Sequence, residues 1–375
     1  EAAAHGGLPV AQQILWRQDT MLIPTPYWGI FVGSDGGDWR WICDEAINTL
    51  QTRRVVIGSD GQYLYATDRV GLTVSSDGGC TWKPATGDIA TLDIAALAAD
   101  PSPSAPKRVY VLANSAEPAK TGLYRSDDGG STWTLIRSVG MELPSGIAIS
   151  SDSKAIAVVT MSAPPRQPIL HSSNNSGATF ISSMFDLSTA LGGQAVLSVV
   201  PLAFDGPTPA PLYLRVSTDA GHSLFRFDGL GAPTKLLDVS AMIYGIARDP
   251  QSRALMVGTG RGLYQQQPDQ SFQSLTTVSM AQCLSEHGST LYACSWNYAP
   301  DLAAIGRLSN ANKTLTKVFQ YHETKGPLDC APTTSVGQIC PAVWLSYAEQ
   351  LGVMLPPTMM PPTTPDEPGD GCQCT

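Results

Sequence analysis

Short apolar runs bounded by turn residues follow one another along most of the chain. A typical unit has an apolar strand, a turn, a second strand and then a third strand that begins at Gly. The third unit illustrates this with Val109-Tyr110-Val111 and Gly122-Leu123-Tyr124. Runs of this length, rich in β-branched and aromatic residues and separated by turn signals, predict β-strands. A recurrence of about 30–45 residues predicts stacked four-stranded units.

We divide the chain into seven such units, with six or eight as alternatives. They are residues 14–42, 55–83, 94–137, 146–184, 196–239, 243–275 and 282–321. The pattern predicts an all-β fold: one β-propeller of seven blades, each with four antiparallel strands, followed by a short C-terminal helical cap and a Pro-rich tail. Because an open edge strand invites aggregation, we expect residues 8–23 to add a strand to the last blade.

One turn motif recurs before the fourth strand of the early units. Residues 75–82 read S-S-D-G-G-C-T-W and residues 126–133 read S-D-D-G-G-S-T-W. Residues 173–180 have Asn for Asp and Phe for Trp, and residues 33–39 hold a version one residue shorter. The acidic side chain can accept backbone N–H groups across its own turn, and Gly supplies the positive φ. We expect the aromatic residue to pack between neighbouring sheets.

These segments resemble the Asp-box, or bacterial neuraminidase repeat. The resemblance implies a propeller in which the motif joins the outer two strands of a blade, away from the central channel. It therefore implies a structural role, not a catalytic one, for the motif residues. These are Asp35, Asp77, Trp82, Asp128, Trp133, Asn175 and Phe180. The last three units lack the motif, and residues 217–221 imitate it only before a third strand.

Charge excludes several classes of partner. The 375 residues carry a formal net charge of −9 and no block of Lys or Arg. Nucleic-acid binding needs a basic footprint, so we expect neither nucleic acid nor an anionic membrane surface as partner. No run of 18 apolar residues is present, so we expect no transmembrane segment. Scattered His residues and the absence of a C-x-x-C pair predict no metal site and no cofactor.

Eight cysteines indicate disulfides and an oxidising compartment. Cys283 and Cys294 flank one predicted hairpin turn, so they can face each other across two strands. The spacing further favours a pair between Cys330 and Cys340, which bracket a short loop. Adjacent blades could bring Cys43 to Cys80. Eight cysteines allow 105 connectivities, so these pairs are hypotheses.

The composition changes after the seventh unit, and this change predicts three parts. They are a propeller (1–325), a disulfide-bridged cap (326–354) that contains a helix at 341–352, and a Pro/Thr-rich stalk and tail (355–375). The ending with Cys372 and Cys374 resembles C-terminal sorting tails of myxobacterial surface proteins. The segments 5–7, 39–44, 326–330 and 340–344 are similar to secreted myxobacterial propellers. The resemblance implies a bacterial protein that is secreted or held at the cell surface, with Cys372 and Cys374 as anchor or processing sites, including lipid attachment. The alternative is a disordered tail with two thiols.

Enzymatic activity is not predicted. In sialidases, which share the Asp-box, an Arg of an early F/Y-R-I-P segment binds the substrate carboxylate; here Leu22 occupies that position in Met21-Leu22-Ile23-Pro24. Four acidic residues lie near predicted loops, but their spacing singles out no pair: Asp60, Asp93, Asp152 and Asp249. Tyr27 and Trp28 fit packing better than ligand contact. The leading hypothesis is an extracytoplasmic, non-enzymatic scaffold that binds protein or glycan. The alternatives are a secreted glycoside hydrolase and a subunit of a self-assembling surface structure.

Overall fold

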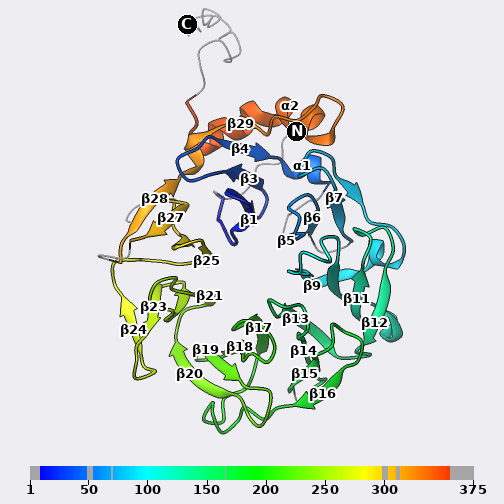
Figure 1. The fold of residues 1–375 in the computed structure, drawn as a ribbon, viewed down its shortest axis with the longest axis vertical. Helices are drawn as coiled ribbons and strands as arrows, with labels where there is room; N and C mark the ends of the chain where they lie inside the picture. The colour runs from blue at the N-terminus through cyan, green and yellow to red at the C-terminus, as the bar shows by residue number, and fades with distance from the viewer. Residues whose placement is uncertain are drawn as a thin grey trace, which may run out of the picture.

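Seven blades, each with four antiparallel strands, surround a central opening in a computed structural model of the chain, and the sheet of one blade gains a fifth strand (Figure 1). The structure describes residues 9–48, 54–68, 71–164, 166–297, 303–309 and 313–354. In each blade the first strand lies at the opening and the fourth at the rim, so the predicted seven-bladed propeller is confirmed.

The first four blades cover the part of the chain that holds the turn motif. Blade 1 contains β1 (Leu15–Arg17), β2 (Thr20–Thr25), β3 (Gly29–Gly33) and β4 (Trp39–Ile42). Blade 2 contains β5 (Arg54–Ile57), β6 (Leu64–Thr67), β7 (Thr73–Ser75) and β8 (Lys83–Pro84). Blade 3 contains β9 (Asp93–Ala99), β10 (Val109–Asn114), β11 (Gly122–Ser126) and β12 (Thr134–Ser138). Blade 4 contains β13 (Leu143–Ile149), β14 (Ile156–Met161), β15 (Pro168–Ser173) and β16 (Ile181–Met184).

The remaining blades repeat the order without the motif. Blade 5 contains β17 (Ser198–Phe204), β18 (Leu212–Thr218), β19 (Gly221–Phe227) and β20 (Thr234–Val239). Blade 6 contains β21 (Ile243–Arg248), β22 (Leu255–Thr259), β23 (Gly262–Gln266) and β24 (Phe272–Leu275). Blade 7 contains β25 (Cys283–His287), β26 (Thr290–Cys294), β27 (Ile305–Leu308) and β28 (Leu315–Phe319). Short helical turns lie at α1 (Asp44–Ile47), η1 (Asp88–Thr91), η2 (Pro118–Lys120) and η3 (Tyr321–Glu323).

The ring does not close as the sequence predicts. Blade 7 takes all four strands from its own segment, and β1 pairs with β2 inside blade 1. The expectation that residues 8–23 extend the last blade is therefore wrong. The contact across this seam is made by side chains instead: the Trp16 indole stacks on His287 at 3.9 Å and donates to Ser285 Oγ at 2.8 Å. Within the described residues, no strand of blade 1 pairs with a strand of blade 7.

A C-terminal belt, residues 324–354, covers the rim of blade 1 (Figure 1). Its strand β29 (Thr324–Pro327) runs parallel to β4 as a fifth strand. Its helix α2 (Ser335–Leu351) then returns along the same rim, and Trp344 packs on Trp41. The helix begins earlier than predicted because Thr334 caps it by accepting the Gly337 N–H at 3.1 Å. Pro341 therefore lies inside the helix and does not mark its start.

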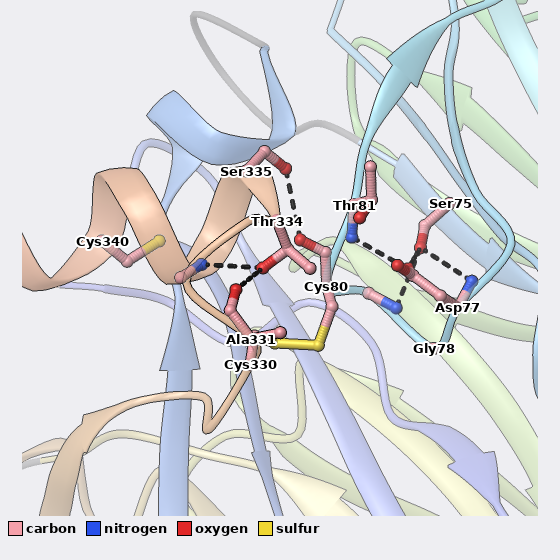
Figure 2. Close-up of a disulfide and its surroundings, with 12 residues drawn as sticks. Ser75, Asp77, Gly78, Cys80, Thr81, Cys330, Ala331, Thr334, Ser335 and Cys340 are labelled. Carbon is pink, nitrogen blue, oxygen red and sulfur yellow. Dashed lines mark hydrogen bonds between the residues drawn. A yellow bond between two sulfur atoms is a disulfide. The ribbon is translucent and has the colours of Figure 1, made fainter.

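Two disulfides fasten the belt to two blades. Cys340 in α2 bonds Cys43, directly after β4, and Cys330 bonds Cys80 in blade 2. Figure 2 shows the second bridge beside the first turn of α2, where Ser335 Oγ donates to the Cys80 carbonyl. The proposed pairs Cys43–Cys80 and Cys330–Cys340 are therefore wrong, since each blade cysteine bonds a cysteine of the belt. Cys283–Cys294 is paired as predicted, across β25 and β26.

Candidate ligand-binding face

The antiparallel order of each blade sorts its turns onto two faces of the ring. Turns from first to second strand and from third to fourth strand lie on one face. We call it the box face, because it carries the motif turns at Asp77, Asp128 and Asn175. Turns from second to third strand, and the connections between blades, lie on the opposite face. We call this the mouth face; it carries Tyr27 and Trp296.

The motif turns are closed by their own side chains. Asp77 Oδ1 accepts the Ser75 hydroxyl and the Thr81 N–H, both at 2.8 Å (Figure 2). Asp128 Oδ1 accepts the Thr132 N–H at 2.9 Å, and Asp128 Oδ2 accepts the Thr132 hydroxyl at 2.6 Å. The hydroxyl bond from Thr132 contributes most to lowering the pKa of Asp128 to about 2. The carboxylate acts as a local acceptor and is not directed into the channel.

Two variant motifs depart from this pattern. Asn175 Oδ1 accepts the Thr179 N–H at 2.9 Å, while Asn175 Nδ2 donates to the Thr179 hydroxyl at 2.8 Å. The direction of that bond is reversed because an amide nitrogen is a donor. Asp35 does not close its turn as expected. Its Oδ2 accepts Arg307 Nη1 at 2.8 Å and the Tyr292 hydroxyl at 3.3 Å, both from blade 7.

The second glycine of each motif lies against the preceding blade. A Cβ on Gly79 would come within 2.8 Å of Ile42 in blade 1, and one on Gly130 within 2.9 Å of Val74 in blade 2. Both glycines also have positive φ. Close approach and backbone geometry therefore both require glycine. The motif aromatics join the hydrophobic clusters at these seams: Trp82, Trp133 and Phe180.

Ion pairs join the blades where the motif is missing. Arg248 of blade 6 binds Asp205 of blade 5 through two nitrogens, and Tyr213 also donates to Asp205, at 3.2 Å. Lys313 of blade 7 donates to the buried Asp249 of blade 6 at 3.2 Å. Other seams of the box face are bridged by the pairs Arg17–Gly78, Ser59–Ser102, Ser153–Asp100 and Thr208–Asp152. The box face thus holds the ring together.

The four candidate catalytic carboxylates do not converge. Asp60, Asp152 and Asp249 lie on three different blades of the box face, whereas Asp93 begins β9 on the mouth face. Asp152 accepts the Thr208 hydroxyl of blade 5 at 3.1 Å. Asp60 accepts N–H groups of its own turn. Leu22, at the position of the sialidase arginine, is fully buried in β2.

A second recurrent feature escaped the sequence reasoning. Four second strands end in a threonine whose hydroxyl donates to the carbonyl of a glycine that starts or precedes the next strand. They are Thr25, Thr67, Thr218 and Thr259. These bonds close the turns of the mouth face. A Thr three or four positions before Gly, repeated at the same place in four units, was the sequence signal that could have revealed these turns.

The mouth face collects exposed apolar side chains around the channel. Five of them lie on the connections into β13, β17 and β21 or at the first residues of these strands, which are neighbouring inner strands at the opening (Figure 1). We call these five residues the mouth patch: Met141, Leu143, Leu197, Met242 and Tyr244. Their exposed fractions run from 38% to 82%. Tyr27 and Trp296 add exposed aromatic rings on the same face, whereas Trp28 is buried beneath α2. Exposed apolar side chains on neighbouring elements make this face a candidate interaction surface.

Positive charge accompanies the mouth patch. Arg215 lies in β18 and donates Nη1 to the Ile243 carbonyl at 2.7 Å, beside Tyr244. Its Nε is buried and has no hydrogen-bond partner among the described residues. Burial, and then the charge of Arg54, lower the pKa of Arg215. Burial, and then the charge of Arg215, likewise lower the pKa of His222. In a chain of net charge −9, this grouping favours an anionic group.

Another polar cluster has the composition of a hydrolase triad. Ser182 Oγ lies 2.8 Å from His171 Nδ1, and His171 Nε2 lies 2.7 Å from Glu142 Oε2. However, Arg137 Nη2 contacts both the Ser182 hydroxyl and His171 Nδ1, at 2.5 and 3.1 Å. His171 is only 2% exposed. The Arg137 guanidinium of blade 3 is bound to the Ser182 hydroxyl that a hydrolase would use as nucleophile. The cluster therefore links blade 3 to blade 4.

A cavity of about 710 Å³ lies at the rim between the belt and blades 1 and 7. Its walls include Trp39 and Trp344, whose rings are almost fully buried. Glu323, also in the wall, is bound by Lys317. Asp38, His322 and Lys325 also line the cavity, so its wall is partly charged.

Several predictions concern regions beyond these surfaces. Cys372 and Cys374, the tail 355–375 and the segment 5–7 lie outside the described residues. No helix in the described part of the chain has the length and apolar character needed to cross a bilayer. Within the same residues, no three His, Cys, Asp or Glu side chains are grouped so that they could hold a metal ion.

Comparison with solved structures identifies the fold. A GH74 xyloglucanase from Xanthomonas campestris is 15% identical; the match covers 84% of this chain and 55% of that one, with a TM-score of 0.56. The extracellular domain of a one-component system from B. thetaiotaomicron is 17% identical, covering 80% and 38%, with a TM-score of 0.55. Kuenenia stuttgartiensis hydrazine synthase is 13% identical, covering 83% and 98%, with a TM-score of 0.57.

The chain spans about half or less of the length of the first two of these structures. No family model matches it, and no curated protein does. Identities this low establish a fold and not an activity. The chain is therefore a seven-bladed β-propeller, and its disulfides indicate an extracytoplasmic location.

Proposed function

We propose that the chain is an extracytoplasmic, non-enzymatic binding scaffold that uses the mouth face to hold a protein segment. The segment would present apolar side chains next to a carboxylate. The observation that carries the proposal is the mouth patch lying beside Arg215, whose buried Nε has no partner among the described residues. That Nε is closed to solvent, so a carboxylate of the segment would pair with the rest of the partly exposed Arg215 guanidinium, where partial burial strengthens the bond.

The two faces of the ring have different roles: the box face stabilises the ring and the mouth face is available for binding. On the box face, acidic side chains are used within turns and across blade seams, including Asp128, Asp205 and Asp249. On the mouth face, apolar groups remain exposed on three adjacent blades. A rigid ring also loses little conformational entropy when a partner binds its loops, which favours affinity. We further propose that the Asp-box residues are structural and that the tail after the belt attaches the ring to a surface.

A fluorescent peptide pair tests the binding mode. The probe is fluorescein-Gly-Gly-Gly-Leu-Leu with a free C-terminal carboxylate, compared with its C-terminal amide. We expect the acid to bind in fluorescence anisotropy and the amide to bind at least tenfold more weakly. Arg215→Gln should remove that preference. Tyr244→Ala should weaken both peptides. Leu230→Ser, an exposed leucine on the box face, is the matched control and should change nothing.

The rival functions give different results. Equal binding of acid and amide, or no binding by either peptide at millimolar concentration, would count against the proposal. Release of reducing ends from xyloglucan or another polysaccharide would instead support the glycoside hydrolase. Binding of a polysaccharide without cleavage would favour a glycan over a protein partner.

A further inference from the structure

The cavity between the belt and blades 1 and 7, which we call the rim cavity, has the size of a binding pocket. Its volume of about 710 Å³ falls within the range of about 300–1,000 Å³ that is typical of ligand sites. Its apolar wall is made by Trp39, Val318, Trp344, Val353 and Met354. The wall therefore combines β4, the end of blade 7, the helix α2 and the residues that follow this helix.

Two tryptophans of this wall have indole N–H groups without a hydrogen-bond partner among the described residues. They are Trp39 and Trp344, which are only 2% and 6% exposed. Neither nitrogen is among the sealed atoms that lack a partner, so each N–H still meets open space. Other indoles donate to nearby acceptors: Trp16, Trp41, Trp82 and Trp133. A nearly buried donor without an acceptor is costly, which favours an occupant that carries acceptors.

Packing holds both indole rings in place and leaves their edges for contact. Phe319 stacks on Trp39 with ring centroids 4.0 Å apart, and a Cβ on Gly33 would collide with the same ring. The faces of Trp39 are therefore used in packing. The Nε1 of Trp344 lies beside Gly326 of β29, where a Cβ would come within 3.9 Å of it. Both donors are thus fixed in position before anything binds.

The chain itself continues from the wall of the rim cavity. Gly352, Val353 and Met354 line it, and Leu355-Pro356-Pro357-Thr358 follow in the sequence. Because proline has no backbone N–H, this segment is rich in carbonyl acceptors and poor in donors. Each proline also restricts the residue before it to extended conformations, so the segment has little freedom to lose when it binds. Stiff Pro-rich segments dock in aromatic-lined grooves for these reasons.

We propose that residues 355–358 occupy the rim cavity as a polyproline II segment, with carbonyl groups that accept the indole N–H groups of Trp39 and Trp344. Three residues of polyproline II extend about 9 Å, which suits a cavity of about 710 Å³. The two indole donors would then gain the acceptors that the rest of the described chain does not give them.

The covalent connection favours this segment over a separate ligand. Met354 already lies in the wall, so the next residues reach the cavity without the loss of translational freedom that a separate ligand undergoes. The charged side chains of the wall do not oppose an uncharged segment. Asp38, His322 and Lys325 are exposed and stay in water, and residues 355–365 carry no charge. Docking would fix where the tail leaves the ring, and this does not depend on what binds the mouth face.

Methyl NMR of the full chain, labelled with methyl-13C methionine, tests the docking. The reporter is Met359, one residue after the segment, and Met359→Leu assigns its signal. In wild type this methyl should relax with the ring. In W39F/W344F, which keeps two aromatic rings and removes both N–H groups, its transverse relaxation rate should fall about threefold or more, because the tail then moves like a free terminus. Trp296→Phe, an exposed tryptophan of the mouth face, is the matched control and should leave the rate unchanged.

A tail variant makes the test independent of the buried tryptophans. L355G/P356G/P357G should free the Met359 methyl, whereas P361G/P362G/P365G, placed just beyond the reporter, should not. Circular dichroism checks that each variant keeps its fold. The proposal is overturned when the wild-type methyl already relaxes like a free terminus, when either docking variant leaves its rate unchanged, or when a control lowers it. Binding of acetyl-Leu-Pro-Pro-Thr-amide to wild type at millimolar concentration, seen as a shift of the Met354 methyl, would also overturn it, because the cavity would then be open to another chain.

Discussion

The belt disulfides make a quantitative prediction about stability. Cys43–Cys340 spans 297 residues of sequence and Cys80–Cys330 spans 250. In the chain-entropy model, either bridge alone stabilises by about 5.5–6 kcal/mol, because it closes a very long loop of the unfolded chain. The bridges are nested, however. With Cys80–Cys330 intact, Cys43–Cys340 closes only a loop made of the segments 43–80 and 330–340, about 47 residues long. Closing a loop of that length stabilises the fold by about 4 kcal/mol.

Removing Cys43–Cys340 should therefore cost an amount that depends on the other bridge. We expect C43A/C340A to lose about 4 kcal/mol in the wild-type background and about 6 kcal/mol when C80A/C330A is already present. Both cysteines are fully buried, so alanine leaves no unpaired polar group. With an unfolding entropy of about 0.7 kcal/mol/K for a chain of this size, the first loss lowers Tm by roughly 6 °C.

Equilibrium urea unfolding of the four variants measures the coupling. C283A/C294A is the control, since its 11-residue separation predicts a loss of about 3 kcal/mol that does not depend on the belt bridges. A loss from C43A/C340A that stays the same or shrinks in the C80A/C330A background would refute the reasoning. It would mean that the bridges act through native contacts of the belt and not through the unfolded chain.

Three further predictions concern single side chains. The pKa of Asp128 is lowered in the folded state, so its carboxylate stabilises the fold above about pH 4, and that contribution is lost as pH falls toward 2. The difference in stability between wild type and D128N should therefore shrink between pH 4 and pH 2 when thermal unfolding is measured as a function of pH. Arg248→Ala should cost about 2–4 kcal/mol because it leaves the half-buried Asp205 carboxylate without a cation, bound only by the Tyr213 hydroxyl. Arg253→Ala, from an exposed pair, should cost less than about 1 kcal/mol in urea titrations. Thr259→Val should cost about 1 kcal/mol by the same method, since it deletes a buried hydroxyl bond. A larger loss from Arg253→Ala than from Arg248→Ala, or a D128N difference that grows at low pH, would contradict these assignments.

The blades themselves were predictable because their bonds are local. The Asp128 side chain closes a turn with Thr132, only four positions away. Each blade is one continuous segment of chain, so strand patterning alone gave seven units at close to their observed bounds. The pair Cys283–Cys294 was predictable for the same reason, since it joins neighbouring strands of one hairpin.

Contacts between distant segments were decided only by the tertiary structure. The belt crosses blade 1 and joins Cys340 to Cys43, and no local pattern encodes a partner 297 residues away. Asp35 has the residues of a turn motif, yet its carboxylate binds Arg307 because ring closure brings blade 7 to its side. The mouth patch joins connections of three blades that the sequence keeps some 50 residues apart. The sequence by itself therefore determined the repeat, and closure of the ring determined which side chains pair and which remain exposed.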